Sequence, residues 1–193
     1  HKIEGTNFTG SLLIGHSTTG TLSSALNNTG VGIGALDALT TGDANVAIGN
    51  LAGSAITEGA SNILIGRSAG DALTTGNGNV AVGHFALSAE DTYGRNIAIG
   101  AEALKVQNAG SNAYNIAIGY QAGKAISTGT RNTIIGGEAG DALTTGSRNT
   151  VLGYGALTTE DGGSYNVAIG YSALMNLDAG DAYNVAVGYE AGT

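Results

Sequence analysis

The chain has 193 residues, a formal net charge of -8 and only 11% charged residues. Its seven Lys and Arg residues are scattered, whereas nucleic-acid backbones are bound by clustered basic side chains, so we expect no nucleic-acid partner. Cysteine is absent, which excludes a disulfide scaffold, and no apolar run approaches the roughly 18 residues of a membrane span or resembles an export signal.

A five-residue pattern recurs along the chain, and Asn45-Val46-Ala47-Ile48-Gly49 is one of its clearest copies. The closing glycines fall at positions 15, 32, 49, 66, 83, 100, 119, 136, 153, 170 and 188. The step is 17 residues, apart from one of 19 and one of 18, so there are eleven repeat units. A fixed short period predicts a repeat architecture. We therefore expect a lead-in segment over 1–10 and a single β-solenoid repeat domain over 11–193.

Each five-residue copy predicts a short strand. Its second and fourth positions, such as Val46 and Ile48, are mostly β-branched and point to one face, which we expect to be the buried face. The third position points the other way and is mostly small. Because this second face also avoids water, we expect it to contact a partner chain. The candidate interface residues are Ala47, Ala81, Ala98, Ala117, Ala168 and Ala186.

The remainder of each unit predicts turns. The unbroken glycine column indicates a corner with positive φ or a position where a side chain would collide with its neighbour. A nearly unbroken alanine column follows three residues later, where we expect a second short strand or an extended turn. One apolar residue such as Leu73 or Leu143 then precedes turn residues. Recurrent glycine excludes helix, so the pattern predicts an all-β protein in which about eleven coils stack as a parallel β-solenoid.

An asparagine column opens the strands. Side-chain amides at equivalent positions of stacked coils can donate to one coil and accept from another, which would form a ladder. Alternatively, each asparagine satisfies the backbone of its own turn. The members are Asn28, Asn45, Asn62, Asn79, Asn96, Asn115, Asn132, Asn149, Asn166 and Asn184.

The repeated Asn-Val-Ala-Ile-Gly, followed by Tyr-x-Ala-Gly or Tyr-x-Ala-Leu as at 119–123 and 170–174, resembles the head repeats of YadA-type trimeric autotransporter adhesins. It resembles still more closely the long arrays of bacteriophage tail fibres. This resemblance covers nearly the whole chain and implies a left-handed parallel β-roll. It further implies a homotrimer, which forms a stiff extracellular rod that carries receptor-binding parts.

Candidates for chemistry are few. His1, His16 and His84 lie far apart in sequence, and we expect neither a metal site nor any other cofactor. The acidic pairs Glu90-Asp91 and Glu160-Asp161 occur in turn sequences, where we expect them to be solvated, with cation binding as the alternative. Glycine-rich stretches lack the helix and the Lys of a nucleotide loop, and no catalytic constellation is apparent, so we expect no enzyme.

All eight tyrosines follow Ser88. Tyr120, Tyr154, Tyr171 and Tyr189 share the position just after the glycine. Such a strip offers stiff amphipathic area for sugar rings or a protein receptor. The alternative is structural, in which the tyrosines cover coil edges and join neighbouring chains.

The sequence therefore predicts the shaft of an extracellular trimeric fibre, most consistent with a bacteriophage tail fibre or similar virion appendage that presents host-receptor-binding parts. The alternative is a trimeric adhesin head on a bacterial cell surface that binds host matrix or glycans directly. A third class, an ice-binding solenoid, is suggested by Thr-Thr pairs such as Thr74-Thr75, but these pairs do not recur in consecutive coils.

Overall fold

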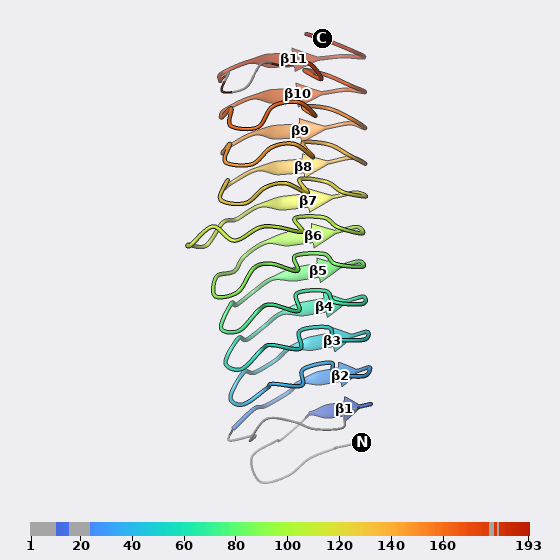
Figure 1. The fold of residues 1–193 in the computed structure, drawn as a ribbon, viewed down its shortest axis with the longest axis vertical. Coiled ribbons are helices and arrows are strands. Elements are labelled where there is room, and N and C mark those ends of the chain that lie inside the picture. The colour runs from blue at the N-terminus through green and yellow to red at the C-terminus, as the bar shows by residue number, and fades with distance from the viewer. Residues whose placement is uncertain (1–10, 16–23, 178–179, 181) are drawn as a thin grey trace.

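The computed structural model describes residues 11–15, 24–177, 180 and 182–193. The expected lead-in segment 1–10 and His16 lie outside the described residues. The described chain winds into a stack of similar coils with one short strand on the same side of each coil (Figure 1). The strands are β1 (Leu12–Ile14), β2 (Thr29–Val31), β3 (Val46–Ile48), β4 (Ile63–Ile65), β5 (Val80–Val82), β6 (Ile97–Ile99), β7 (Ile116–Ile118), β8 (Thr133–Ile135), β9 (Thr150–Leu152), β10 (Val167–Ile169) and β11 (Val185–Val187).

The strands form one parallel sheet in sequence order. Each strand pairs only with its neighbours in the sequence, and equivalent repeat positions face each other, as in Val80↔Ile97 and Ala81↔Ala98. No described residue lies in a helix. The prediction of an all-β parallel solenoid with eleven short strands is therefore confirmed.

The sheet buries the face opposite to the one expected. In every strand the middle residue is buried, whereas its two neighbours are half-buried or exposed. Ala47, Ala81, Ala98, Ala117 and Ala168 have no exposed surface and Ala186 has 8%, so none of these candidate interface residues is available to a partner chain. They belong instead to the core of their own chain.

The interior of the coil is narrow, which accounts for this reversal. Each coil contributes only one strand, and the opposite wall is a run of turns that carries the alanine column and an apolar residue such as Leu73. In the coil that contains β4, Leu64, Ala69 and Leu73 all lie in the core cluster. Small side chains on the inner face allow the two walls to meet at close-packed density. The bulkier β-branched residues consequently point outward.

The alanine column lies in turns and not in a second strand. The glycine column meets both conditions that the sequence suggested. Gly83 has a φ of +139°, and a Cβ on it would lie 2.4 Å from the carbonyl oxygen of Gly100 in the next coil. Corner glycines are therefore packed directly on one another along the rod.

The coil of 19 residues places its extra length in a turn, as expected. The loop between β6 and β7 extends beyond the other loops (Figure 1), while the two strands keep the usual register with Ile97 opposite Ile116. The other length change, near Ala179, falls outside the described residues.

Candidate functional site

The asparagine column forms a buried hydrogen-bonded ladder. Asn45 donates its backbone N–H to Oδ1 of Asn28 at 2.9 Å, and its Nδ2 donates to the same oxygen at 3.0 Å. Nδ2 also donates to the carbonyl oxygen of Gly59 at 2.8 Å, which ties the ladder to a turn. Gly59 lies in the next coil, so this bond belongs to the ladder, whereas Nδ2 of Asn28 also donates to its own turn at the oxygen of Leu26, at 3.0 Å. Ser11 takes the place of asparagine at the start by accepting the backbone N–H of Asn28.

The ladder is continuous along the backbone but not along the side chains. The backbone N–H of each later asparagine, from Asn45 to Asn184, donates to Oδ1 of the preceding member. Nδ2 of Asn96 is buried without a hydrogen-bond partner, and Nδ2 of Asn115 donates to Oε1 of Gln107 at 2.7 Å. The interruption coincides with the longer loop between β6 and β7.

Glu90 and Glu160 are buried, which contradicts the expectation that both acidic pairs are solvated. They occupy the core position that Leu73 and Leu143 hold in neighbouring coils. Oε1 of Glu160 accepts the backbone N–H groups of Gly162, Gly163 and Gly180. The carboxyl groups therefore stabilise turns in which the leucine of this position is absent.

Burial raises the pKa of Glu90 from its ordinary value of 4.5 to about 7. Its Oε1 accepts the backbone N–H of Tyr93 at 3.2 Å, which favours the charged form, but Oε2 is buried without a hydrogen-bond partner. Desolvation outweighs the hydrogen bonds from the backbone of Tyr93 and Asp91, and the neighbouring Asp91 charge raises the pKa of Glu90 further.

The outer face of the sheet is apolar. It consists of the first and third residues of each strand, and the exposed members range from Ile99 at 36% to Val185 at 73%. Only Thr29, Thr133 and Thr150 interrupt the aliphatic residues of this face. The face is continuous over the eleven strands.

One edge of this face carries arginine and tyrosine residues. We define the leading edge as the residue immediately before the asparagine of each coil; from β6 to β11 it holds Arg95, Tyr114, Arg131, Arg148, Tyr165 and Tyr183. All six are exposed. The guanidinium groups of Arg95 and Arg148 lie 5.6 and 5.2 Å from the rings of Tyr114 and Tyr165, and each donates to the hydroxyl of that tyrosine.

The opposite, trailing edge comprises the two residues after the closing glycine and contains the predicted tyrosine strip. Tyr154, Tyr171 and Tyr189 stack in succession, with centroid separations of 5.8 and 5.2 Å. Tyr120 is also exposed, but Gly137 occupies the corresponding position of the coil between Tyr120 and Tyr154. The structure therefore joins three of the four candidate residues in one stack.

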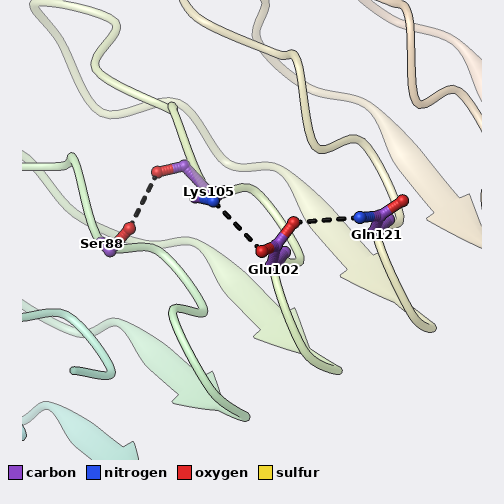
Figure 2. A network of polar contacts seen from close by, with 4 residues as sticks. All are labelled: Ser88, Glu102, Lys105 and Gln121. Carbon is purple, nitrogen blue, oxygen red and sulfur yellow. Dashed lines mark hydrogen bonds and ion pairs between the residues drawn. The ribbon is translucent and has the colours of Figure 1, made fainter. Parts of the chain in front are cut away.

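The trailing edge also carries carboxylates. The Tyr154 hydroxyl donates to Oε2 of Glu138 at 2.6 Å, and this contact raises the pKa of Tyr154. Figure 2 shows Glu102 between Lys105 and Gln121: Lys105 Nζ lies 3.1 Å from Oε1, and Gln121 Nε2 donates to Oε2 at 3.0 Å. The Lys105 hydrogen bond is the main reason why the pKa of Glu102 is lowered.

Other candidates for chemistry do not assemble. His84 packs against the Phe85 ring at a centroid separation of 4.2 Å. Across the described ranges, no group of three His, Cys, Asp or Glu residues is placed to hold a metal ion. Thr74 and Thr144 donate their hydroxyls to backbone oxygens of Asp91 and Asp161 in the next coil, so those hydroxyls serve the solenoid itself.

Comparison with known proteins found no matching family model, no matching curated protein and no matching solved structure. Within the part of the chain that the structure describes, no helix is long and apolar enough to cross a lipid bilayer.

Proposed function

We propose that this chain is the shaft of an extracellular homotrimeric fibre, and that the fibre is a bacteriophage tail fibre or a similar virion appendage carrying host-receptor-binding parts. The observation that supports the proposal is the continuous apolar outer face of the sheet. The sequence resemblance to tail-fibre arrays supports the trimer, the left-handed winding and the setting.

The outer face is large enough to need a cover. Eleven strands about 4.8 Å apart give a strip roughly 48 Å long, and a width of about 10 Å gives roughly 500 Å² of mostly apolar surface. A patch of this size is comparable to the largest apolar patch on a typical soluble monomer, and such patches are often interaction sites. Including the leading and trailing edges about doubles the width, and the resulting area of roughly 1,000 Å² reaches the size of a standard interface per partner.

Stiffness follows from hydrogen bonds around the entire coil. In the coil that contains β4, Ile63 N–H donates to the oxygen of Asn79, Gly70 N–H to that of Ala86 and Thr74 N–H to that of Asp91. Bonds thus join consecutive coils on the strand side and also on the turn side. Such a stack resists bending and internal opening, which suits a spacer.

The test is the mass of the native particle. We expect light scattering and native mass spectrometry to give three times the 18.9 kDa chain mass, and electron microscopy to show a straight rod. A folded monomer that remains soluble at high concentration would refute the trimeric shaft.

Direct binding of a cell-surface glycan or protein receptor, as in a bacterial adhesin head, is the second candidate. It is favoured by the exposed stack of Tyr154, Tyr171 and Tyr189. Within the stack, however, the ring planes of Tyr171 and Tyr189 are only 9° from parallel, so their facing surfaces cover each other. Binding of the purified rod to cells or glycan arrays, abolished by Tyr171→Ala, would favour this candidate over a passive shaft.

A further inference from the structure

In two coils, the two edges of the outer face carry opposite charges. Arg95 on the leading edge shares its coil with Glu102 on the trailing edge, and Arg131 likewise shares its coil with Glu138. In both cases the acid follows the arginine by seven residues, with one three-residue strand between them.

Arg131 and Glu138 do not satisfy each other within one chain. The strand β8, roughly 10 Å long, and the corner at Gly136 separate them, so they lie at opposite edges of the outer face. Among the described residues, no ion pair or hydrogen bond involves the Arg131 guanidinium, and Oε1 of Glu138 has no hydrogen-bond partner. Both groups therefore remain available for contact with another molecule.

The sizes of the edge residues are also complementary. Where the leading edge carries Arg95 or Arg131, the first trailing position is small, namely Ala101 or Gly137. A long guanidinium side chain placed against that position can pass over it and reach the acid at the next residue. In the coils of β7, β10 and β11, both edges instead carry tyrosine.

We propose that identical chains pack side by side as parallel rods, with equivalent coils at the same height. The leading edge of one chain lies against the trailing edge of the next, and Arg131 pairs with Glu138 across each contact. Two coils away, Arg95 and Glu102 lie at the same two edges, but each also has a partner in its own chain: Arg95 donates to the Tyr114 hydroxyl, and Glu102 pairs with Lys105. This inference rests on the proposed homotrimer and specifies its geometry.

Symmetry accounts for the register. In a trimer of parallel rods, the rotation axis runs along the rods and the strands lie perpendicular to it. Rotation about this axis places the end of each strand beside the start of the equivalent strand in the next chain, at the same height. Antiparallel rods packed through the same face would instead bring leading edge against leading edge and arginine against no carboxylate. Opposite charges within a single coil therefore favour parallel rods that are level with each other.

A charge-swap cycle tests the pairing. Arg131→Glu and Glu138→Arg should each raise the protein concentration of half-dissociation about tenfold or more, because each places like charges at every contact of the assembly. The double variant, Arg131→Glu with Glu138→Arg, should recover most of the wild-type value. The control combines substitutions at different heights: Arg95→Glu with Glu138→Arg should not restore the wild-type concentration of half-dissociation, since these residues lie two coils apart.

The outcomes separate the two proposals. If the wild type is a trimer but the double variant is as weak as the two single changes combined, the proposed register is wrong and the trimeric shaft stands. The same holds if the control pair Arg95→Glu with Glu138→Arg restores the trimer equally well. A monomeric wild type overturns both proposals. Circular dichroism of each variant verifies that the solenoid is intact, as expected for substitutions at exposed or half-buried positions.

Discussion

The side-chain amide of Asn62 donates to Oδ1 of Asn45 at 3.0 Å, and both residues are completely buried. The same amide donates to the carbonyl oxygen of Gly76 at 2.9 Å, while Oδ1 of Asn62 accepts the backbone N–H of Asn79 at 2.9 Å. One side chain thus fixes three successive coils relative to each other. The ladder supplies polar partners to a turn region that the core could not otherwise bury.

Asparagines of the ladder should differ in their contribution to stability. Asn62→Ala removes donors and acceptors whose buried partners are left unsatisfied, and we expect it to lower the free energy of unfolding by about 3 kcal/mol. Asn96→Ala should lower it by only about 1 kcal/mol, because Nδ2 of Asn96 has no partner to lose. Urea denaturation of both variants gives the comparison, and equal losses would show that the ladder amides do not act as described.

Adjacent residues of β6 should separate folding from assembly. Ala98 has no exposed surface whereas Ile99 lies on the outer face. Ala98→Lys buries a charge and should lower the free energy of unfolding of the chain by more than about 3 kcal/mol. Ile99→Lys should leave the circular dichroism spectrum unchanged but prevent trimer formation in light scattering. A trimer that tolerates Ile99→Lys would contradict an interface on the outer face.

Stability should fall as pH rises through the range in which Glu90 titrates. Below its ordinary pKa of 4.5, Glu90 is protonated in both the folded and unfolded chain. Between pH 4.5 and about 7 only the unfolded chain releases the proton, so the free energy of unfolding declines, and it then levels off. The decline is on the order of a few kcal/mol, since each pKa unit corresponds to about 1.4 kcal/mol.

Glu90→Gln should remove most of this pH dependence, because a neutral amide replaces the carboxyl. Gln107 already occupies the equivalent position of the next coil, which shows that the core there accepts glutamine. Urea midpoints at pH 5 and pH 8 provide the measurement, with the exposed Glu58→Gln as the matched control. A wild-type slope retained in Glu90→Gln would assign the effect to another group.

The corner glycines should tolerate no side chain. Gly83→Ala places a methyl group 2.4 Å from the Gly100 oxygen at a φ of +139°. We expect this substitution to lower the free energy of unfolding by more than about 3 kcal/mol. Gly162→Ala is the control, because the nearest atom to its Cβ would be Thr145 Oγ1 at an ordinary 3.5 Å. Thermal unfolding of the two variants should differ by many degrees, and similar melting temperatures would exclude direct packing of corner on corner.

Much of the fold could be predicted because the repeat is regular. The period located the strands, the buried asparagines and the corner glycines, since each depends on the same position recurring in stacked coils. The predicted inner and outer faces were the reverse of those in the structure, because both faces of the strand are apolar and polarity could not distinguish them. The sequence did hold one signal: threonine occurs at outward positions such as Thr133 and Thr150, whereas the inward position never carries a polar side chain.

The candidate site was less predictable for a related reason. Glu90 and Glu160 precede Asp and turn residues, a context typical of solvated acids, and only alignment with Leu73 and Leu143 reveals their core position. Arginines of the leading edge are scattered in the linear sequence, so their stacking with tyrosines emerges only when the coils are superposed.

The projecting loop between β6 and β7 also shows how the shaft keeps its dimensions. The additional residues project from the side of the rod while Ile97 and Ile116 stay paired. The rise per coil along the rod therefore does not depend on the number of residues in the coil. At Gly110 in this loop, an added Cβ would touch nothing within 4 Å. A peptide tag grafted there would be displayed at a fixed height on the shaft, which makes this position a natural marker for measuring distances along the fibre.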